Sequence, residues 1–548
     1  MQLMNTNTKR NIWLVASGDL RLAANQQCWP AQQQMEDALT QALERRGYSV
    51  ERAHPYSPEQ QHGFITSQKM GIEVFHRIPA AEPVIAAEAL WQYSQHVLPG
   101  LMTHSGPVLT VANWSGQWPG LVGLLNLNAS LTKAGIAYSS IWSETFRDPF
   151  FEAALDQWLQ TGSIRHTIDH VEDFEPEAIP AADEQAGRVF ADGFRHRKSV
   201  IGVFDEGCMG MFNAIVPDSL LNPTGIFKER LSQSALYARM CAVSREEAEA
   251  VLSWLLDKGM RFNWGTDEKL HLTRSQTLEQ CRMYIAAIRM AAGFGCDAIG
   301  IQYQQGLMDL TAASDLVEGL LNNTDRPPVF AENGNELYAG RALPHFNEVD
   351  ECAAIDGLLT YRLWETMGMP GENTLHDIRW GEDFETVGGE KEFVWVLMIS
   401  GAVPPAHFEN GYRDAVSERQ PPMFFHKGGG TVKGVAKPGH IVWSRIYIMD
   451  GGLHCDLGVG EAVQLPDKET IRRWNATNPE WPIMHAVLKG VSRDQMMARH
   501  KSNHIQVVYA TDEKTAHRAC RIKAAAMTEL GIRTHFCGAV DIKGSIVK

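Results

Sequence analysis

The chain has 548 residues, which at about 100–200 residues per domain suggests two to four domains. Its apolar fraction of 44% and charged fraction of 21% are ordinary for folded proteins and exclude a disordered chain. Lys and Arg number 50 and Asp and Glu 65, so the formal net charge is −15. Because this acidic chain has no dense basic stretch, we expect neither nucleic acid nor an anionic membrane as its partner.

The apolar runs and the cysteines indicate where the chain resides. No run approaches the roughly 18 apolar residues that a membrane helix needs, and the apolar run at 12–16 is shorter than a signal peptide requires. The nine cysteines are odd in number, scattered and without a CxxC pair. This usage is typical of reduced thiols rather than of disulfides or a structural zinc site. We therefore expect a cytoplasmic protein.

The first third of the chain alternates strand and helix patterns. Apolar runs predict strands over 11–17, 49–54, 108–113 and near 137, with amphipathic helices over 31–46 and 121–134. Such alternation favours a parallel, doubly wound sheet. The acidic, proline-containing stretch 171–184 has the composition of a linker. We therefore predict an N-terminal α/β domain over 1–172.

A second alternating block and a β-rich block follow. Strands over 200–204 and 298–302 with helices over 246–258 and 278–294 predict a second α/β domain over 173–350. A helix over 352–367, strands over 393–399, 440–449, 451–456, 504–509 and near 535, and a helix over 512–530 predict a C-terminal domain over 351–548. The sequence thus predicts an α/β protein with two doubly wound, Rossmann-like domains followed by a mixed, β-rich domain.

Three segments concentrate residues that bind metals. The run 347–351, Asn-Glu-Val-Asp-Glu, precedes a predicted helix, where acidic residues favour the helix dipole, so alone it is an ordinary first turn. The run 376–380, His-Asp-Ile-Arg-Trp, could equally hold a buried Asp–Arg pair, and a lone histidine such as that at 504 is usually structural. Together, two carboxylates and one imidazole suit Mn²⁺ or Mg²⁺. Two carboxylates beside such a cation can act as base and acid in enolisation next to a carbonyl.

Two further polar clusters follow predicted strands. Residues 112–120 combine tryptophans, among them Trp114, with amide side chains, and Gln302 begins the run Gln-Tyr-Gln-Gln. Ligands of α/β sheets bind at the carboxyl ends of strands, and aromatic faces with amides suit sugars. Either cluster could also be a packed turn. We expect Trp114 and Gln302 to bind substrate.

Several segments resemble the L-fucose isomerase family, in its broader fucose and arabinose isomerase-like branch. They are His-Phe-Asn-Glu-Val-Asp-Glu at 345–351, Thr-Leu-His-Asp-Ile-Arg-Trp-Gly-Glu at 374–382 and Asn-His-Ile-Gln-Val at 503–507. Val-Ala-Asn-Trp-Ser-Gly at 111–116 and Gly-Phe-Gly-Cys-Asp-Ala-Ile-Gly-Ile-Gln at 293–302 are similar too, so the resemblance covers most of the chain. It implies a cytoplasmic ketol isomerase that interconverts an aldose and a ketose with Mn²⁺, or with Mg²⁺ or Co²⁺, and forms a homo-oligomer, a trimer or hexamer.

The resemblance also implies the site residues. The family holds its metal with a Glu, an Asp and a His, and the Asp and His correspond to Asp377 and His504. The Glu-x-Asp pattern assigns the glutamate to Glu348, whereas alignment on the following helix assigns it to Glu351. We favour Glu348 as ligand and place Glu351 and Asn503 among the substrate-binding residues. Glu348 and Asp377 are then also the expected catalytic residues.

Two other functions remain to be weighed against the isomerase. The first is a non-catalytic sugar-binding or regulatory protein on the same scaffold, because fold alone does not fix function. The second is a nicotinamide oxidoreductase, but the glycine string at 293–300 ends a helix and leads into a strand. A dinucleotide fingerprint has the reverse order, so we set this class aside. Within the isomerase class, a hydride shift competes with proton transfer through an enediol.

Overall fold

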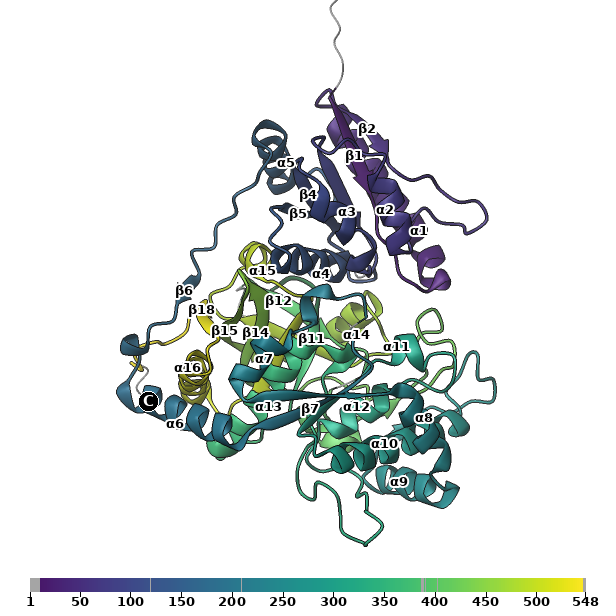
Figure 1. Cartoon of the computed structure of the whole chain (residues 1–548), viewed down its shortest axis with the longest axis vertical. Helices are drawn as coiled ribbons and strands as arrows, with labels where there is room; N and C mark the ends of the chain where they lie inside the picture. The colour runs from purple at the N-terminus through teal and green to yellow at the C-terminus, as the bar shows by residue number, and fades with distance from the viewer. Residues whose placement is uncertain are drawn as a thin grey trace, which may run out of the picture. The chain divides into compact units, whose positions relative to one another are not determined.

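The computed structural model describes residues 10–118, 120–207, 209–385, 389, 391–401 and 403–545. The chain divides into two compact units, an N-terminal unit of Met1–Thr167 and a C-terminal unit of Ile168–Lys548 (Figure 1). Both mix helices and strands and both contain a parallel sheet, so the predicted α/β class is confirmed. The finer division at residues 172 and 350 stays a prediction.

The N-terminal unit is built on a parallel sheet of five strands in the order β2-β1-β3-β4-β5. Every residue of β3 and β5 is buried, as expected for a parallel sheet covered on both faces. Its elements are β1 (Asn11–Val15), α1 (Leu22–Glu44), β2 (Ser49–Arg52), α2 (Gln68–Phe75), β3 (Val84–Glu88), α3 (Leu98–Thr103), β4 (Val108–Asn113), α4 (Gly120–Lys133), β5 (Ser139–Ser143) and α5 (Pro149–Thr161).

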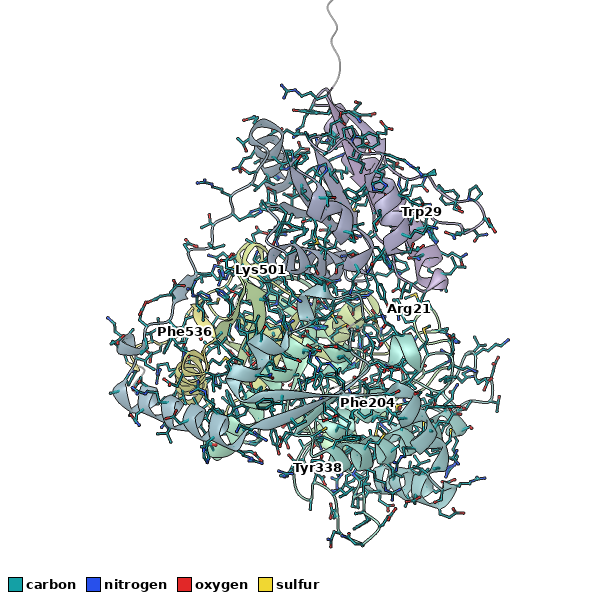
Figure 2. The ribbon with its side chains drawn as sticks, viewed as in Figure 1. Arg21, Trp29, Phe204, Tyr338, Lys501 and Phe536 are labelled. Atoms are coloured by element: carbon teal, nitrogen blue, oxygen red, sulfur yellow. The ribbon has the colours of Figure 1, made fainter. Side chains whose placement is uncertain are left out.

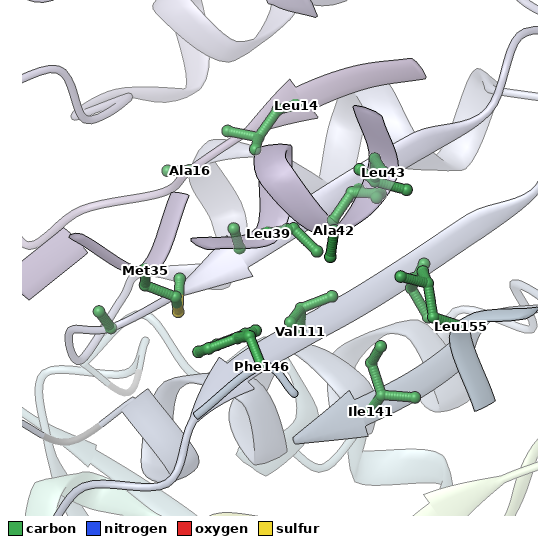
Figure 3. Packing of buried hydrophobic residues seen from close by; sticks show 14 of the residues in the cluster. Leu14, Ala16, Met35, Leu39, Ala42, Leu43, Val111, Ile141, Phe146 and Leu155 are labelled. Atoms are coloured by element: carbon green, nitrogen blue, oxygen red, sulfur yellow. The ribbon is translucent and has the colours of Figure 1, made fainter. Parts of the chain in front are cut away.

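Helices α1 and α5 pack into one apolar core with the sheet. Met35 and Leu39 of α1 and Leu155 of α5 meet strand residues such as Val111 and Ile141 (Figure 3). The helix α1 begins earlier than predicted, and Pro30 lies inside it. The predicted helix began after this proline, a residue that usually interrupts a helix. In the structure the buried face of α1 extends to both sides of Pro30.

The C-terminal unit begins with a smaller parallel sheet of three strands in the order β10-β7-β8. Phe204, labelled in Figure 2, ends its central strand. The elements of this part are β7 (Ser199–Phe204), β8 (Ile226–Leu231), α8 (Gln233–Ala242), α9 (Arg245–Asp257), α10 (Arg274–Phe294) and β10 (Ala298–Ile301). A single bridge between Ile299 and His345 brings the chain that leads to Glu348 alongside β10.

The rest of the C-terminal unit is organised around a closed ring of antiparallel strands. The strand β14 pairs with both β17 and β15, which closes the order β14-β17-β11-β12-β16-β15 into a barrel. Beyond β15 the sheet continues through β18 and β6. These strands are β6 (Val171–Asp173), β11 (Asn373–Glu385), β12 (Lys391–Met398), β14 (Gly439–Met449), β15 (Gly452–Ala462), β16 (Ile483–Leu488), β17 (His504–Tyr509) and β18 (Arg533–Cys537).

Two long helices, α13 (Glu351–Thr366) and α16 (Glu513–Glu529), pack against β14 of the barrel. A buried polar cluster joins the three elements: the Lys523 ammonium on α16 donates to Asp356 on α13 at 2.7 Å and to Ser444 on β14 at 2.6 Å. The Ser444 hydroxyl also lies 2.8 Å from the Asp356 carboxylate. This cluster fixes the position of α13, whose first turn reaches the candidate site.

The remaining elements are short or peripheral. They are α6 (Ala181–Arg197), α7 (Asp218–Leu221), β9 (Arg261–Phe262), α11 (Tyr303–Gly306), α12 (Asp315–Leu321), β13 (Val416–Ser417), α14 (Asp467–Asn475) and α15 (Arg493–Arg499). The stretch predicted as a linker, 171–184, is instead structured, because β6 pairs with β18 and α6 begins within it. Among the described residues, no helix has both the length and the apolar character needed to cross a bilayer. None of the eight described cysteines forms a disulfide, and Cys208 lies outside the described residues.

Candidate metal centre

Strand pairing in the barrel brings Asp377 and His504 together. They are opposite partners in the antiparallel pair β11–β17, so their side chains leave the same face of the sheet. The Asp377 Oδ1 atom lies 3.5 Å from His504 Nε2. Directly after Ile378 the register of β11 against β12 shifts, and such bulges often re-aim side chains beside functional sites.

Glu348 reaches the same histidine from a strained loop. Its carboxylate Oε2 lies 3.7 Å from His504 Nε2. Glu348 and Val349 both have left-handed backbones, with φ of 57° and 54°. Two successive non-glycine residues in this region are unusual, and a β-branched valine there is an outlier. Strain of this kind persists only when the surroundings impose it, and it clusters at functional sites.

The loop is held on both sides. Before it, the Phe346 N–H donates to Ile299 O at 3.0 Å, and the Ile301 N–H donates to the His345 ring at 3.2 Å. After it, the Asp350 side chain caps α13 by accepting the Ala353 N–H at 2.9 Å. The parallel sheet and the helix therefore fix the ends of the loop, and the short connection between them takes the left-handed conformation that points Glu348 toward His504.

His504 is completely buried, and its contacts determine which ring nitrogen is available. Its Nδ1 lies 2.7 Å from Asp350 Oδ2, and a carboxylate can only accept, so Nδ1 carries the hydrogen. Its Nε2 is buried and has no hydrogen-bond partner in the described part of the chain. Nε2 thus faces Glu348 and Asp377, whose side chains are 12% and 14% exposed. Solvent reaches the carboxylates but not the imidazole.

The electrostatics of the site are dominated by carboxylates. Burial lowers the pKa of His504, but Asp350, Asp377 and Glu348 outweigh it and hold that pKa above its usual value. Burial raises the pKa of Asp377, opposed by His504, Arg379 and Asn503. Three acidic groups gathered on one histidine therefore favour a positive charge at Nε2, from a proton or from a cation.

A divalent cation fits this donor set in chemistry and nearly in spacing. Two ligands of one cation at about 2.1 Å and a right angle lie roughly 3.0 Å apart, so at that angle the distances of 3.5 and 3.7 Å would shorten by about 0.5 to 0.7 Å. No set of three or more His, Cys, Asp and Glu side chains, within the residues that the structure describes, already stands at ligand spacing. The unpaired Nε2 and the two accessible carboxylates are nevertheless the donors that Mn²⁺ takes.

The other predicted residues of the C-terminal unit occupy distinct places. The Asn503 amide donates to Asp377 Oδ1 at 3.3 Å, which places Asn503 at the site. Glu351 instead accepts from Lys228 and from the Val216 N–H, at 2.8 and 2.7 Å, inside the fold. Of the two candidate glutamates, the structure therefore brings only Glu348 into contact with His504.

Gln302 lies at the carboxyl end of β10, as predicted, and is fully buried with both amide atoms lacking hydrogen-bond partners among the described residues. Its neighbour Ile301 bonds to His345, which ties the end of β10 to the loop of Glu348. Trp114 belongs to the N-terminal unit, where it follows β4 and is 7% exposed. Its backbone N–H donates to Ser143 O at 2.8 Å. The prediction that Trp114 binds substrate stays a prediction. Pro119 of the same cluster lies outside the described residues.

Two residues of the site escaped the sequence analysis as functional candidates. Asp350 belongs to the acidic run, and the sequence predicted its place before a helix. Its contact with His504 could not be predicted. Arg445 pairs with Asp350 at 2.6 Å, 95 positions along the chain. An arginine in a predicted strand carries no signal for such a contact, because only the closing of the barrel creates it.

Comparison of the chain with known protein families and with curated proteins finds no match. The resemblance to L-fucose isomerases therefore rests on the quoted segments alone, and the geometry of the site is an independent observation.

Proposed function

We propose that this protein is an aldose–ketose isomerase that uses a divalent cation, Mn²⁺ in the first instance, held by Glu348, Asp377 and His504. The observation that carries the proposal is the convergence of two accessible carboxylates on the unpaired Nε2 of a buried histidine whose other nitrogen is fixed. Catalytic metal sites typically offer three protein ligands and leave positions open for substrate. The proposal includes a cytoplasmic location and a homo-oligomer, which come from the family resemblance.

The bound cation would supply Lewis acidity toward two neighbouring oxygens of an open-chain sugar. The proton chemistry belongs to the side chains. In the direction from aldose to ketose, one carboxylate removes the proton from C2, which gives an enediol of the sugar, and a proton is then delivered to C1. The second carboxylate moves the hydroxyl proton from O2 to O1, so no hydrogen is gained or lost. Burial raises the pKa of Asp377, which makes its carboxylate a stronger base when ionised.

The neighbours of Asp377 prepare it for this role. Asn503 donates to its Oδ1 and so orients the carboxylate. Arg379 on the same strand is buried, and burial lowers its pKa to about 10, with Asp377 opposing that change. A buried guanidinium near the base stabilises the ionised carboxylate, because opposite charges attract strongly where water is excluded.

Turnover with a panel of sugars tests the proposal. Aldopentoses, deoxyhexoses and charged aldoses are offered to protein stripped with EDTA, with and without added Mn²⁺, and ketose is measured. We expect ketose only with the metal. Asp377→Asn should abolish it, whereas Asp383→Asn, a matched change at an exposed position of the same strand, should not. Sugar binding without ketose from any member of the panel would favour the non-catalytic alternative.

A further inference from the structure

His504 also makes three hydrogen bonds on the side that faces away from Glu348 and Asp377. Its Nδ1 contacts Asp350, and its backbone carbonyl accepts from the His500 ring at 2.8 Å. Its backbone N–H donates to the Ser502 hydroxyl at 3.0 Å. The backbone of His504 is therefore held on both sides, and Asp350 is the contact that orients the ring and sets its tautomer.

The Asp350 carboxylate has every acceptor position occupied. Arg445 donates through both terminal nitrogens, to Oδ2 at 2.6 Å and to Oδ1 at 3.1 Å. With the Ala353 N–H and His504 Nδ1, four donors share the two oxygens. A carboxylate offers about four such positions, so Asp350 has none left for a cation. Although it belongs to the Glu-x-Asp motif, Asp350 is not placed as a ligand.

We infer that Asp350 and Arg445 are positioning residues for His504. Arg445 holds the Asp350 carboxylate in one orientation, and Asp350 keeps a hydrogen of His504 on Nδ1, so that Nε2 is the ring nitrogen that faces Glu348 and Asp377. Asp350 and the Arg445 side chain are at most 2% exposed, so water does not replace either contact. Outer partners of metal-binding histidines typically contribute 10–100-fold to metal affinity. The functional consequence rests on the proposed metal site, but the tautomer does not.

Asp350→Asn tests the inference with almost no change in shape, and asparagine caps a helix about as well as aspartate. The amide brings an NH₂ group to a place where every neighbour is a donor. Arg445 and the Ala353 N–H cannot become acceptors, so His504 must, by moving its hydrogen to Nε2. Nitrogen-15 NMR of histidine-labelled, metal-free protein, recorded as the pH is raised until the His504 ring is neutral, reports the tautomer directly.

In the wild type we expect a bare Nε2 and a protonated Nδ1, with the assignment reversed in Asp350→Asn. Calorimetry should show Mn²⁺ affinity reduced about 10–100-fold in the variant. The matched control is Asp456→Asn, which breaks another buried pair, with Arg499 at 2.7 and 2.9 Å, and should alter neither readout. Arg445→Lys keeps the charge but loses the two-pronged contact, and it should weaken Mn²⁺ binding even if Asp350→Asn fails to fold.

The outcomes separate the inference from the proposed function. A wild-type His504 with its hydrogen on Nε2 would overturn the inference, as would unchanged Mn²⁺ affinity in both Asp350→Asn and Arg445→Lys. A wild-type protein that has the expected tautomer but binds no Mn²⁺ would refute the proposed metal site and leave the assignment of Asp350 intact.

Discussion

The left-handed backbone at Glu348 predicts an inverted response to glycine. At most positions a protein with glycine is less stable than the same protein with alanine, by about 1 kcal/mol within a helix. At Glu348 the order should reverse, because φ is 57° and a Cβ atom in this region costs roughly 1–2 kcal/mol. Glycine also has more conformational freedom in the unfolded chain, and this offsets about 0.5–1 kcal/mol of its advantage at Glu348. We therefore expect Glu348→Gly to be more stable than Glu348→Ala by about 1 kcal/mol.

Urea denaturation of the two metal-free variants measures this difference, and comparing Ala with Gly at one position cancels the loss of the carboxylate. Ala250→Gly, at an exposed position inside α9, is the control and should destabilise the protein by about 1 kcal/mol. If Glu348→Ala proved as stable as Glu348→Gly or more so, the backbone at 348 would not be left-handed in solution. The reasoning that aims its carboxylate at His504 would then be wrong.

Three further predictions concern buried groups of the C-terminal unit. Burial lowers the pKa of His485 to about 4, whereas a histidine of the unfolded chain has a pKa of about 6.5. Between these two pH values the unfolded chain binds one more proton than the folded chain, so the free energy of unfolding falls as the pH drops. In urea titrations His485→Phe should reduce this pH dependence by about one proton, and an unchanged slope would contradict the burial of His485. Lys523→Met should lower the free energy of unfolding by about 3–5 kcal/mol, because it leaves the buried Asp356 without its ionic partner. Adding Asp356→Leu should restore part of that free energy in the same assay. A Lys523→Met variant as stable as the wild type would show that the ion pair is not formed. Glu351→Gln should lower the melting temperature through Lys228 while Mn²⁺ affinity in calorimetry stays within about twofold, and a lost affinity would restore Glu351 as a ligand.

Several strands of the fold were predicted from local apolar runs, although the buried strands β3 and β16 were missed. The run 504–509 became β17 and 108–113 became β4, with the predicted bounds. The closing of the barrel could not be predicted, because it depends on β14 pairing on both sides with strands distant in sequence. The edge strand β6 was missed for a related reason: three residues, Val-Glu-Asp, form a strand only because β18 lies beside them.

The candidate site shows the same division. Residue types indicated a site of two carboxylates and a histidine, and the resemblance to L-fucose isomerases implied Glu348, Asp377 and His504. The register of β11 against β17 places the last two opposite each other. The sequence could not distinguish Glu348 from Glu351, because the distinction lies in a left-handed turn that reverses the expectation of a regular first helical turn. The role of Arg445 could not be predicted, because no local sequence pattern marks it.

The binding of Mn²⁺ itself tests the central claim most directly. Metal-free wild-type protein and His504→Gln are titrated with Mn²⁺, and free ion is counted by electron paramagnetic resonance. The account predicts about one ion bound per wild-type chain, with the site lost in the variant, because glutamine has no imidazole lone pair to offer. No bound ion in the wild type, or equal binding in the two proteins, would contradict it.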